Sequence, residues 1–318
     1  MKTFKKILIP LLVLAMVASF LGVTASADPV SDPLVIYLGS DEAVDGDGTS
    51  ASSPLGVGDE LDEYMNAPLY RAWSQIFASG KTEAVIVFTD TYTIEDADSH
   101  LPVKGDYDVT YYEFEQHREI TITYTSKWNG VDYRETNGAK LTFGGKATLT
   151  FPTTTKTENL TIQGNQNLQS GRHCWIAAGF CELYLGNGTN FLPSAGAATE
   201  LPMVVGGYRH GGNAYGGVTH NQQIANGNKI QRDWTKVTVD LGEGNEMGEL
   251  YGVLGMGSHA AAANSNIIVK SGTVRSIAGD MWGGFANAGN TGDVAITIEG
   301  GTILGRIAAT NSVFATEN

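Results

Sequence analysis

The sequence predicts an all-β fold, a parallel β-solenoid that begins with a capping helix. Short alternating apolar strands recur along most of the chain, and 40 glycines separate them. The stretch "NIIVKSGTVRSIAG" (266–279) is followed, 27 to 30 residues later, by the similar "DVAITIEGGTILGRIAA" (293–309). A repeated unit of this length cannot bury its apolar face alone, but stacked units can.

Residues 1–27 have the features of a secretory signal. Lysines precede an apolar run over 7–23, and the small residues 25–27 form a cleavage site. The net charge of −14 includes three lysines in this segment, so we expect −17 in the mature chain. A protein so acidic repels nucleic acid and anionic lipid, and no later stretch could span a membrane.

The next region, 28–80, is predicted to hold a strand at 34–38, a polar loop and a helix. Asn66 is the expected N-cap, Pro68 lies in the first turn and Gly80 can end the helix. The apolar stripe of this helix consists of Leu69, Trp73, Ile76 and Phe77.

Three aspartates in the loop "DEAVDGDGTS", Asp41, Asp45 and Asp47, raise the question of a Ca²⁺ site. The bidentate Glu that closes an EF-hand is missing, because the residues twelve positions on are Ser52 and Gly56. We therefore favour a turn cluster and predict no cofactor and no metal.

The remaining region, 81–318, is read as the β-helix coils. A column of apolar residues, Val204, Leu250, Ile277 and Ile307, recurs at intervals of 46, 27 and 30 residues, and Gly206, Gly252, Gly279 and Ala309 follow two residues on. We expect the four apolar residues to form one inward, nearly fully buried ladder. An antiparallel β-sandwich is the alternative, but it needs no such column.

Expected strands lie at 83–94, 120–124, 139–143, 147–151, 158–164, 181–188, 236–242, 266–270 and 294–301.

The 46-residue interval predicts a loop insertion near 209–234. No Asp or Glu occurs from Arg209 to Arg232, while amides, histidines and aromatics are frequent. Amides and aromatic faces suit sugars, so this insertion is the candidate ligand-binding site; the alternative is a solvated loop without function. The candidate residues are Arg209, His210, Tyr215, His220, Asn221, Gln222, Arg232 and Trp234.

Two further groups of residues leave alternatives open. Cys174 and Cys181 could pair across a tight hairpin, although two small buried residues are favoured. The acids Glu246, Glu249, Asp280 and Glu299 could be paired by adjacent coils, although solubilising charges at strand edges are favoured.

The stretch "VIYLGSDEAVDGDGTSASSPLG" (35–56), followed by the helix and "AVIVFTDTYTI" (84–94), resembles the start of bacterial surface proteins with a pectin-lyase-like fold. "TENLTIQGN" and "ITIEGGTI" resemble their coil repeats. The resemblance implies a right-handed parallel β-helix. Lyases of that superfamily gather carboxylates around Ca²⁺ with an Arg or Lys base, and its hydrolases cluster aspartates, whereas the repeats of this chain contain no Asp-Asp pair.

These observations lead us to expect a secreted, non-catalytic protein of the bacterial cell surface that binds glycans or mediates adhesion. Its partner would be a polysaccharide or a host or plant glycan. The alternatives are a polysaccharide lyase or glycoside hydrolase of the same fold, and a structural stalk. The sequence stops within a repeat at "AATNSVFATEN", so we expect an incomplete C-terminus and further coils or an attachment module beyond it.

Overall fold

The computed structural model contains one compact unit over Pro33–Asn318 and another over Met1–Asp32. The structure describes residues 32–40, 46–58, 67–94, 117–144, 148–164, 174–194, 200–207, 234–256, 264–283 and 293–312. The predicted secretory signal lies outside these ranges. No helix within them is long and apolar enough to cross a membrane.

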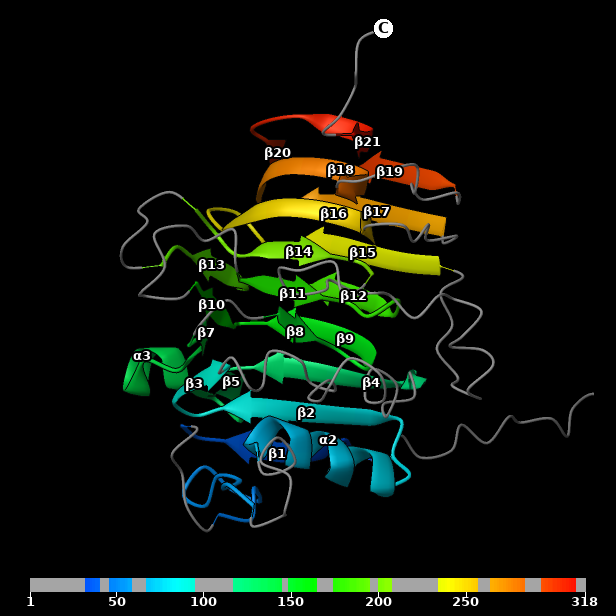
Figure 1. Cartoon of the computed structure of the whole chain (residues 1–318). Coiled ribbons are helices and arrows are strands. Elements are labelled where there is room, and N and C mark those ends of the chain that lie inside the picture. Colours follow the sequence, from blue (N-terminus) through cyan, green and yellow to red (C-terminus); the bar gives the residue numbers. More distant parts are fainter. Residues whose placement is uncertain are drawn as a thin grey trace, which may run out of the picture. The chain divides into compact units, whose positions relative to one another are not determined.

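Most described strands of the larger unit lie in three parallel sheets, and successive coils stack on one another (Figure 1). The longest sheet has eight strands, in the order β1 (Leu34–Leu38), β2 (Glu83–Phe88), β4 (His117–Thr125), β9 (Thr153–Glu158), β12 (Glu182–Leu185), β15 (Trp234–Asp240), β17 (Asn264–Ser271) and β19 (Val294–Ile298). All its neighbouring strands are parallel, so the chain must pass through the rest of a coil before it re-enters this sheet. This is a parallel β-helix.

Two further parallel sheets form the other faces of the coils. One contains β3 (Thr91–Ile94), β7 (Lys140–Phe143), β10 (Thr161–Gln163) and β13 (Asn190–Leu192). The other contains β8 (Thr148–Thr150), β11 (Trp175–Ala177), β14 (Met203–Val205), β16 (Glu246–Met256), β18 (Thr273–Gly283) and β20 (Thr302–Ile303), and β21 (Ile307–Ser312) also pairs with β18. Because these pairs are parallel, the antiparallel sandwich is ruled out.

A short β-hairpin and a helix within the first coils were not predicted. The strands β5 (Lys127–Trp128) and β6 (Val131–Asp132) form an antiparallel hairpin, and α3 (Tyr133–Asn137) follows. The Asp132 side chain caps α3 by accepting a hydrogen bond from the Arg134 N–H, and Gly138 ends the helix with φ of 71°. One helical turn is too short to give a detectable apolar period.

The predicted apolar column is confirmed in register. Val204 pairs with Leu250, Leu250 with Ile277, and Ile277 with Ile307. The first three side chains are at most 1% exposed, but Ile307 is 50% exposed. The expected burial of Ile307 is therefore wrong, because no described coil covers the outer side of β21.

The glycine column has a steric cause. A Cβ on Gly252 would lie 1.7 Å from Ser265 Oγ on β17 and 2.3 Å from the Gly279 carbonyl oxygen. A Cβ on Gly206 would lie 2.4 Å from Thr235 Oγ1 on β15. The backbone of one sheet thus approaches side chains of the other so closely that only glycine fits.

The N-terminal end of the core is covered by α2 (Pro68–Ala78), as predicted (Figure 1). Leu69, Trp73 and Ile76 are fully buried, and Trp73 Nε1 donates a 2.6 Å hydrogen bond to Tyr124 Oη. The N-cap position is Ala67, so the expectation that Asn66 would occupy it is wrong; Asn66 itself lies outside the described residues. Pro68 has no N–H to satisfy and fixes its own φ, which lets the helix begin without a side-chain cap.

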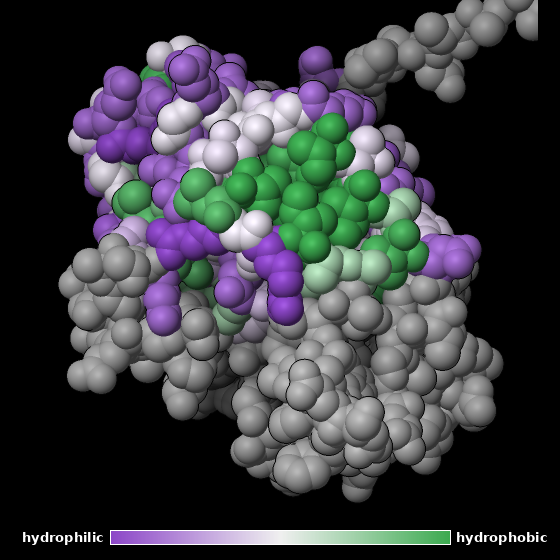
Figure 2. All heavy atoms as spheres, turned by 90° about the horizontal axis from the view of Figure 1, so that it is seen from above, coloured by the Kyte–Doolittle hydropathy of each residue, from purple (hydrophilic) through white to green (hydrophobic). Residues whose placement is uncertain are grey.

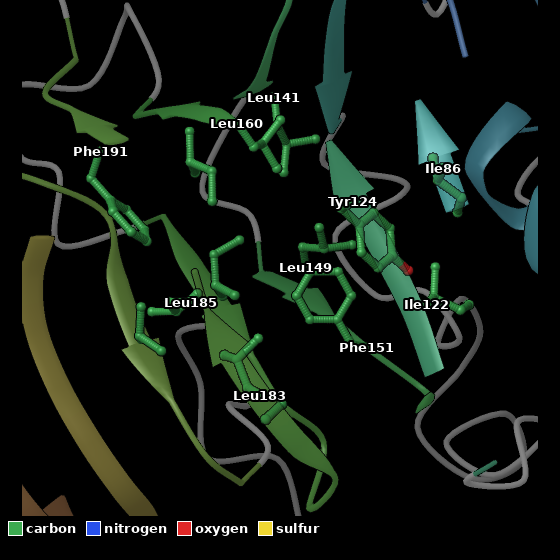
Figure 3. Close-up of a cluster of buried hydrophobic side chains, with 14 of the residues drawn as sticks. Ile86, Ile122, Tyr124, Leu141, Leu149, Phe151, Leu160, Leu183, Leu185 and Phe191 are labelled. Carbon is green, nitrogen blue, oxygen red and sulfur yellow. The ribbon is translucent and has the colours of Figure 1, made fainter. Parts of the chain in front are cut away.

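The interior holds aliphatic and aromatic side chains that face one another across the coil. Figure 3 shows Ile122 and Tyr124 of β4 beside Leu149 and Phe151, and the Tyr124 and Phe151 rings lie 4.8 Å apart. Strand β9 differs, because its inward residues are threonines that are at most 1% exposed. The sequence did not predict β9, since "TTTKTE" lacks apolar alternation.

Candidate functional site

A groove lies on the outer face of the long sheet, where β15, β17 and β19 begin. Trp234 pairs with Asn264, and Lys236 with Asn266, which itself pairs with Ala295. Their neighbours Thr235 and Ser265 are buried, so the side chains of the paired residues point outward. The hollow has a volume of about 310 Å³ and is lined by Trp234, Thr235, Lys236, Asn264, Ser265, Asn266, Asp293 and Ala295.

The indole of Trp234 is held in place by Arg118, at the start of β4. The Arg118 guanidinium carbon lies 4.3 Å from the ring centroid, in a cation–π contact. Its Nε and Nη2 donate to the Phe180 carbonyl at 3.0 and 2.6 Å, and Nη2 also reaches the Trp234 carbonyl at 3.4 Å. These contacts fix both the guanidinium and the aromatic ring before any ligand arrives.

Two amides stand beside the indole. Asn264 Oδ1 accepts a 3.0 Å hydrogen bond from the backbone N–H of Asp293, which orients the amide. The Asn264 Nδ2 group and the whole Asn266 amide have no hydrogen-bond partner among the described residues. They therefore offer donors and an acceptor to a ligand.

The charge of the groove is low. Lys236 Nζ lies 2.7 Å from Glu182 Oε1, so these two charges compensate each other. Asp293 is the remaining ionic residue among those that line the groove. An uncharged polar ligand fits this balance better than a polyanion does.

A second polar cluster lies further along the same strands. Asp240 accepts hydrogen bonds from Tyr184 Oη at 2.5 Å and from Ser271 Oγ at 2.6 Å. The hydrogen bond from Ser271 contributes most to lowering the pKa of Asp240, and the hydrogen bond from Tyr184 lowers it further. On the other partner, donating this hydrogen bond to Asp240 raises the pKa of the Tyr184 hydroxyl to about 12. Both carboxylate oxygens are engaged, so Asp240 links neighbouring coils rather than presenting a free base.

The acids considered from the sequence are engaged separately. Glu246 forms a 2.7 Å ion pair with Arg275, and Glu249 accepts a hydrogen bond from the hydroxyl of Tyr251. Glu299 follows β19, in a different sheet. The side chain of Asp280 lies outside the described residues. Within the part of the chain that is described, no cluster of three or more His, Cys, Asp or Glu could hold a metal ion.

The two cysteines are buried free thiols. Cys174 and Cys181 are both fully buried, and burial raises the pKa of the Cys181 thiol to about 12. The hairpin disulfide left open by the sequence is therefore not formed. In the aspartate loop, Asp47 Oδ1 accepts from Thr49 N at 3.0 Å and from Thr49 Oγ1 at 2.8 Å, as in an Asx turn, whereas Asp41 and Asp45 lie outside the described residues.

Only one of the predicted ligand-binding residues can be placed. Trp234 lines the groove. The other seven lie outside the described residues: Arg209, His210, Tyr215, His220, Asn221, Gln222 and Arg232. Sequence reasoning missed Asn264 and Asn266, although the alternation in "NSNIIV" places both opposite the inward Ile267 and Val269. No local signal could have identified Arg118, which reaches Trp234 across 116 residues of sequence.

Comparison with known proteins identifies no relative. No family model matches the chain. No curated protein and no solved structure matches it either. The chemistry of the groove is therefore the basis for assigning a function.

Proposed function

We propose that this chain is a secreted bacterial surface protein that binds a glycan, without catalysis, in the groove around Trp234. The observation that carries the proposal is an indole immobilised by Arg118 next to two amides with unused hydrogen-bonding groups. The signal-like residues 1–27 and the resemblance to pectin-lyase-like surface proteins support the extracellular setting.

The groove matches the two kinds of surface that a sugar presents. The C–H face of a pyranose ring packs on an aromatic ring, as Trp234 offers, while its hydroxyl edge needs donors and acceptors. On the neighbouring strand, Asn264 is the register partner of Trp234 and Asn266 is that of Lys236. The two amides are therefore separated from the indole and the Lys236 side chain by the distance between neighbouring strands.

The volume and the charge of the groove restrict the class of ligand that it can bind. A volume of about 310 Å³ lies at the lower end of the roughly 300–1,000 Å³ range of small-molecule sites, so one part of a glycan would occupy the groove at a time. The Lys236–Glu182 pair leaves little net charge for an anionic sugar to bind. A neutral polysaccharide or a neutral host or plant glycan is the proposed partner.

A glycan array probed with residues 28–318 tests the proposal, followed by titration of the best-bound glycan. Trp234→Ala should weaken binding at least about tenfold, which corresponds to about 1.4 kcal/mol. The matched control is Trp128→Ala, a partly exposed tryptophan on the distant β5 hairpin, which should bind like the wild type. Each variant should keep the wild-type circular dichroism spectrum.

Two results would contradict this function. If no neutral glycan binds, or if the two tryptophan variants bind equally well, the groove is not a glycan site. Release of new reducing ends or of unsaturated sugars from the bound glycan would instead assign the chain to the hydrolases or lyases.

A further inference from the structure

One ion pair joins the groove to the preceding coil. Lys236 lines the groove, and its ammonium lies 2.7 Å from Glu182 Oε1 on β12. The two residues are direct register partners, so the pair crosses the gap between neighbouring strands. Seen from the end of the stack, the described hydrophobic side chains gather at the centre and hydrophilic ones lie around them (Figure 2). The pair lies on the outer face, where a dissolved glycan can reach it.

The position of β15 gives the Lys236 ammonium two directions in which to reach. Strand β15 lies between β12 and β17, and Lys236 pairs with Glu182 on one side and with Asn266 on the other. The ion pair holds the ammonium on the Glu182 side. Glu182 therefore keeps the positive charge away from the part of the groove where Asn264 and Asn266 present their hydrogen-bonding groups.

The other described charges of the groove do not attract an anion. Lys236 is the one cation among the described residues that line it, and Asp293 adds a carboxylate on the β19 side. The Arg118 guanidinium beside the indole already donates two hydrogen bonds to the Phe180 carbonyl. A sugar carboxylate would have to displace Glu182 from Lys236 while Asp293 and a chain of net charge −14 repel it.

The ion pair is partly shielded from solvent. The side chains of Lys236 and Glu182 are 35% and 34% exposed. Because salt screens partly buried charges less than fully exposed ones, the two charges stay compensated at physiological ionic strength. Glu182 itself does not line the groove, so its charge can be removed without changing the wall that a neutral glycan contacts.

We propose that Glu182 makes the groove selective for neutral over anionic glycans, by holding the Lys236 ammonium away from the ligand. This inference rests on the proposed glycan binding, and it assigns the selectivity to a residue outside the groove wall. Without the Glu182 carboxylate, the ammonium is free to pair with a sugar carboxylate, and the groove accepts uronic acids.

Titration of a matched pair of glycans tests this selectivity. The probes are hexasaccharides of glucose, mannose or galactose: the neutral chain that the wild type binds most tightly, and the same chain with its C6 hydroxymethyl groups oxidised to carboxylates. At about 20 mM salt the wild type should bind the oxidised chain at least about tenfold more weakly. Glu182→Gln should bind the oxidised chain at least about fivefold more tightly than the wild type does, which is the effect expected of a partly exposed ion pair. This gain should largely disappear at about 0.5 M salt.

Two further variants test whether the freed ammonium causes the gain. Adding Lys236→Met to Glu182→Gln should abolish it, because no ammonium remains to bind the carboxylate. The matched control is Glu246→Gln, which breaks the similar 2.7 Å ion pair with Arg275 in another sheet and changes the net charge equally. It should bind both chains like the wild type. Every variant should keep the wild-type circular dichroism spectrum.

The outcomes separate this inference from the proposed function. If the wild type binds no neutral chain, the glycan-binding function fails, and the inference fails with it. If the wild type binds a neutral chain but Glu182→Gln gains no affinity for the oxidised form, only the inference is overturned. A wild type that binds both forms equally, a gain that persists without Lys236, or the same gain in Glu246→Gln would also overturn it.

Discussion

Ile277 and Ile307 provide a measure of what one covering coil contributes to stability. Both are isoleucines of the same ladder and are direct partners in parallel strands. They differ in cover, since Ile277 is 1% exposed and Ile307 is 50% exposed. We therefore expect the two alanine substitutions to have clearly different costs.

The magnitudes follow from the carbons removed. An Ile→Ala change deletes three carbons, and each is worth about 0.8 kcal/mol when fully buried, or about 2.4 kcal/mol together. Ile277 lies between Leu250 and Ile307, so a cavity adds to this term and the total should be about 3–4 kcal/mol. Half-exposed Ile307 should lose about 1 kcal/mol, because its open side leaves no closed cavity.

Urea denaturation followed by both circular dichroism and tryptophan fluorescence measures the difference. Each variant is compared with the wild type at the same protein concentration. The Ile277→Ala midpoint should fall far below that of Ile307→Ala. Equal losses, within about 0.5 kcal/mol, would contradict the difference in burial between Ile277 and Ile307 that the described residues show.

Two more substitutions test the coil geometry. Gly252→Ala should lower the free energy of unfolding by about 3 kcal/mol or more, because the new Cβ would lie 1.7 Å from Ser265 Oγ. Gly244→Ala, where the Cβ meets open space at a φ of 80°, should lower it by only about 1 kcal/mol. Equal losses would contradict the close approach of the two sheets. Because hydrogen bonds depress the pKa of Asp240 below 3.8, its contribution to stability is present above that pH and is lost as pH falls through the lower folded-state pKa. The difference in stability between the wild type and Asp240→Asn should thus be constant at neutral pH and shrink below about pH 4. Tyr184→Phe should differ from the wild type by less over the same pH range. Melting temperatures measured from pH 2 to 7 test this, and a difference that does not change with pH would exclude the linkage.

Much of the fold could be predicted because each coil presents its residues to the next at the same position. Parallel stacking aligns Val204, Leu250, Ile277 and Ile307, so the spacing of similar residues in sequence reports their contact in space. The cap was predictable because α2 has an apolar stripe with helical spacing. Strand β9 was missed because "TTTKTE" lacks apolar alternation: its inward residues are threonines, whose hydroxyls bond inside the coil, as in the 3.4 Å contact between Thr153 Oγ1 and Thr155 Oγ1.

The candidate site was only partly predictable. Trp234 attracted notice because it ends an unusual polar segment, but the groove also needs Asn264, Asn266 and Asp293 from the two following coils. Their outward orientation follows from strand alternation, while their position next to Trp234 depends on the register.

The sequence by itself determined the β-helix, its repeat and its glycine column, because these result from a local period that is repeated along the chain. Only the tertiary structure decided that Arg118 holds Trp234 and that Ile307 is exposed rather than buried. The physical reason is that both depend on contacts between coils. Arg118 reaches residues far away in sequence, and burial at the last coil depends on a layer that no residue within that coil can provide.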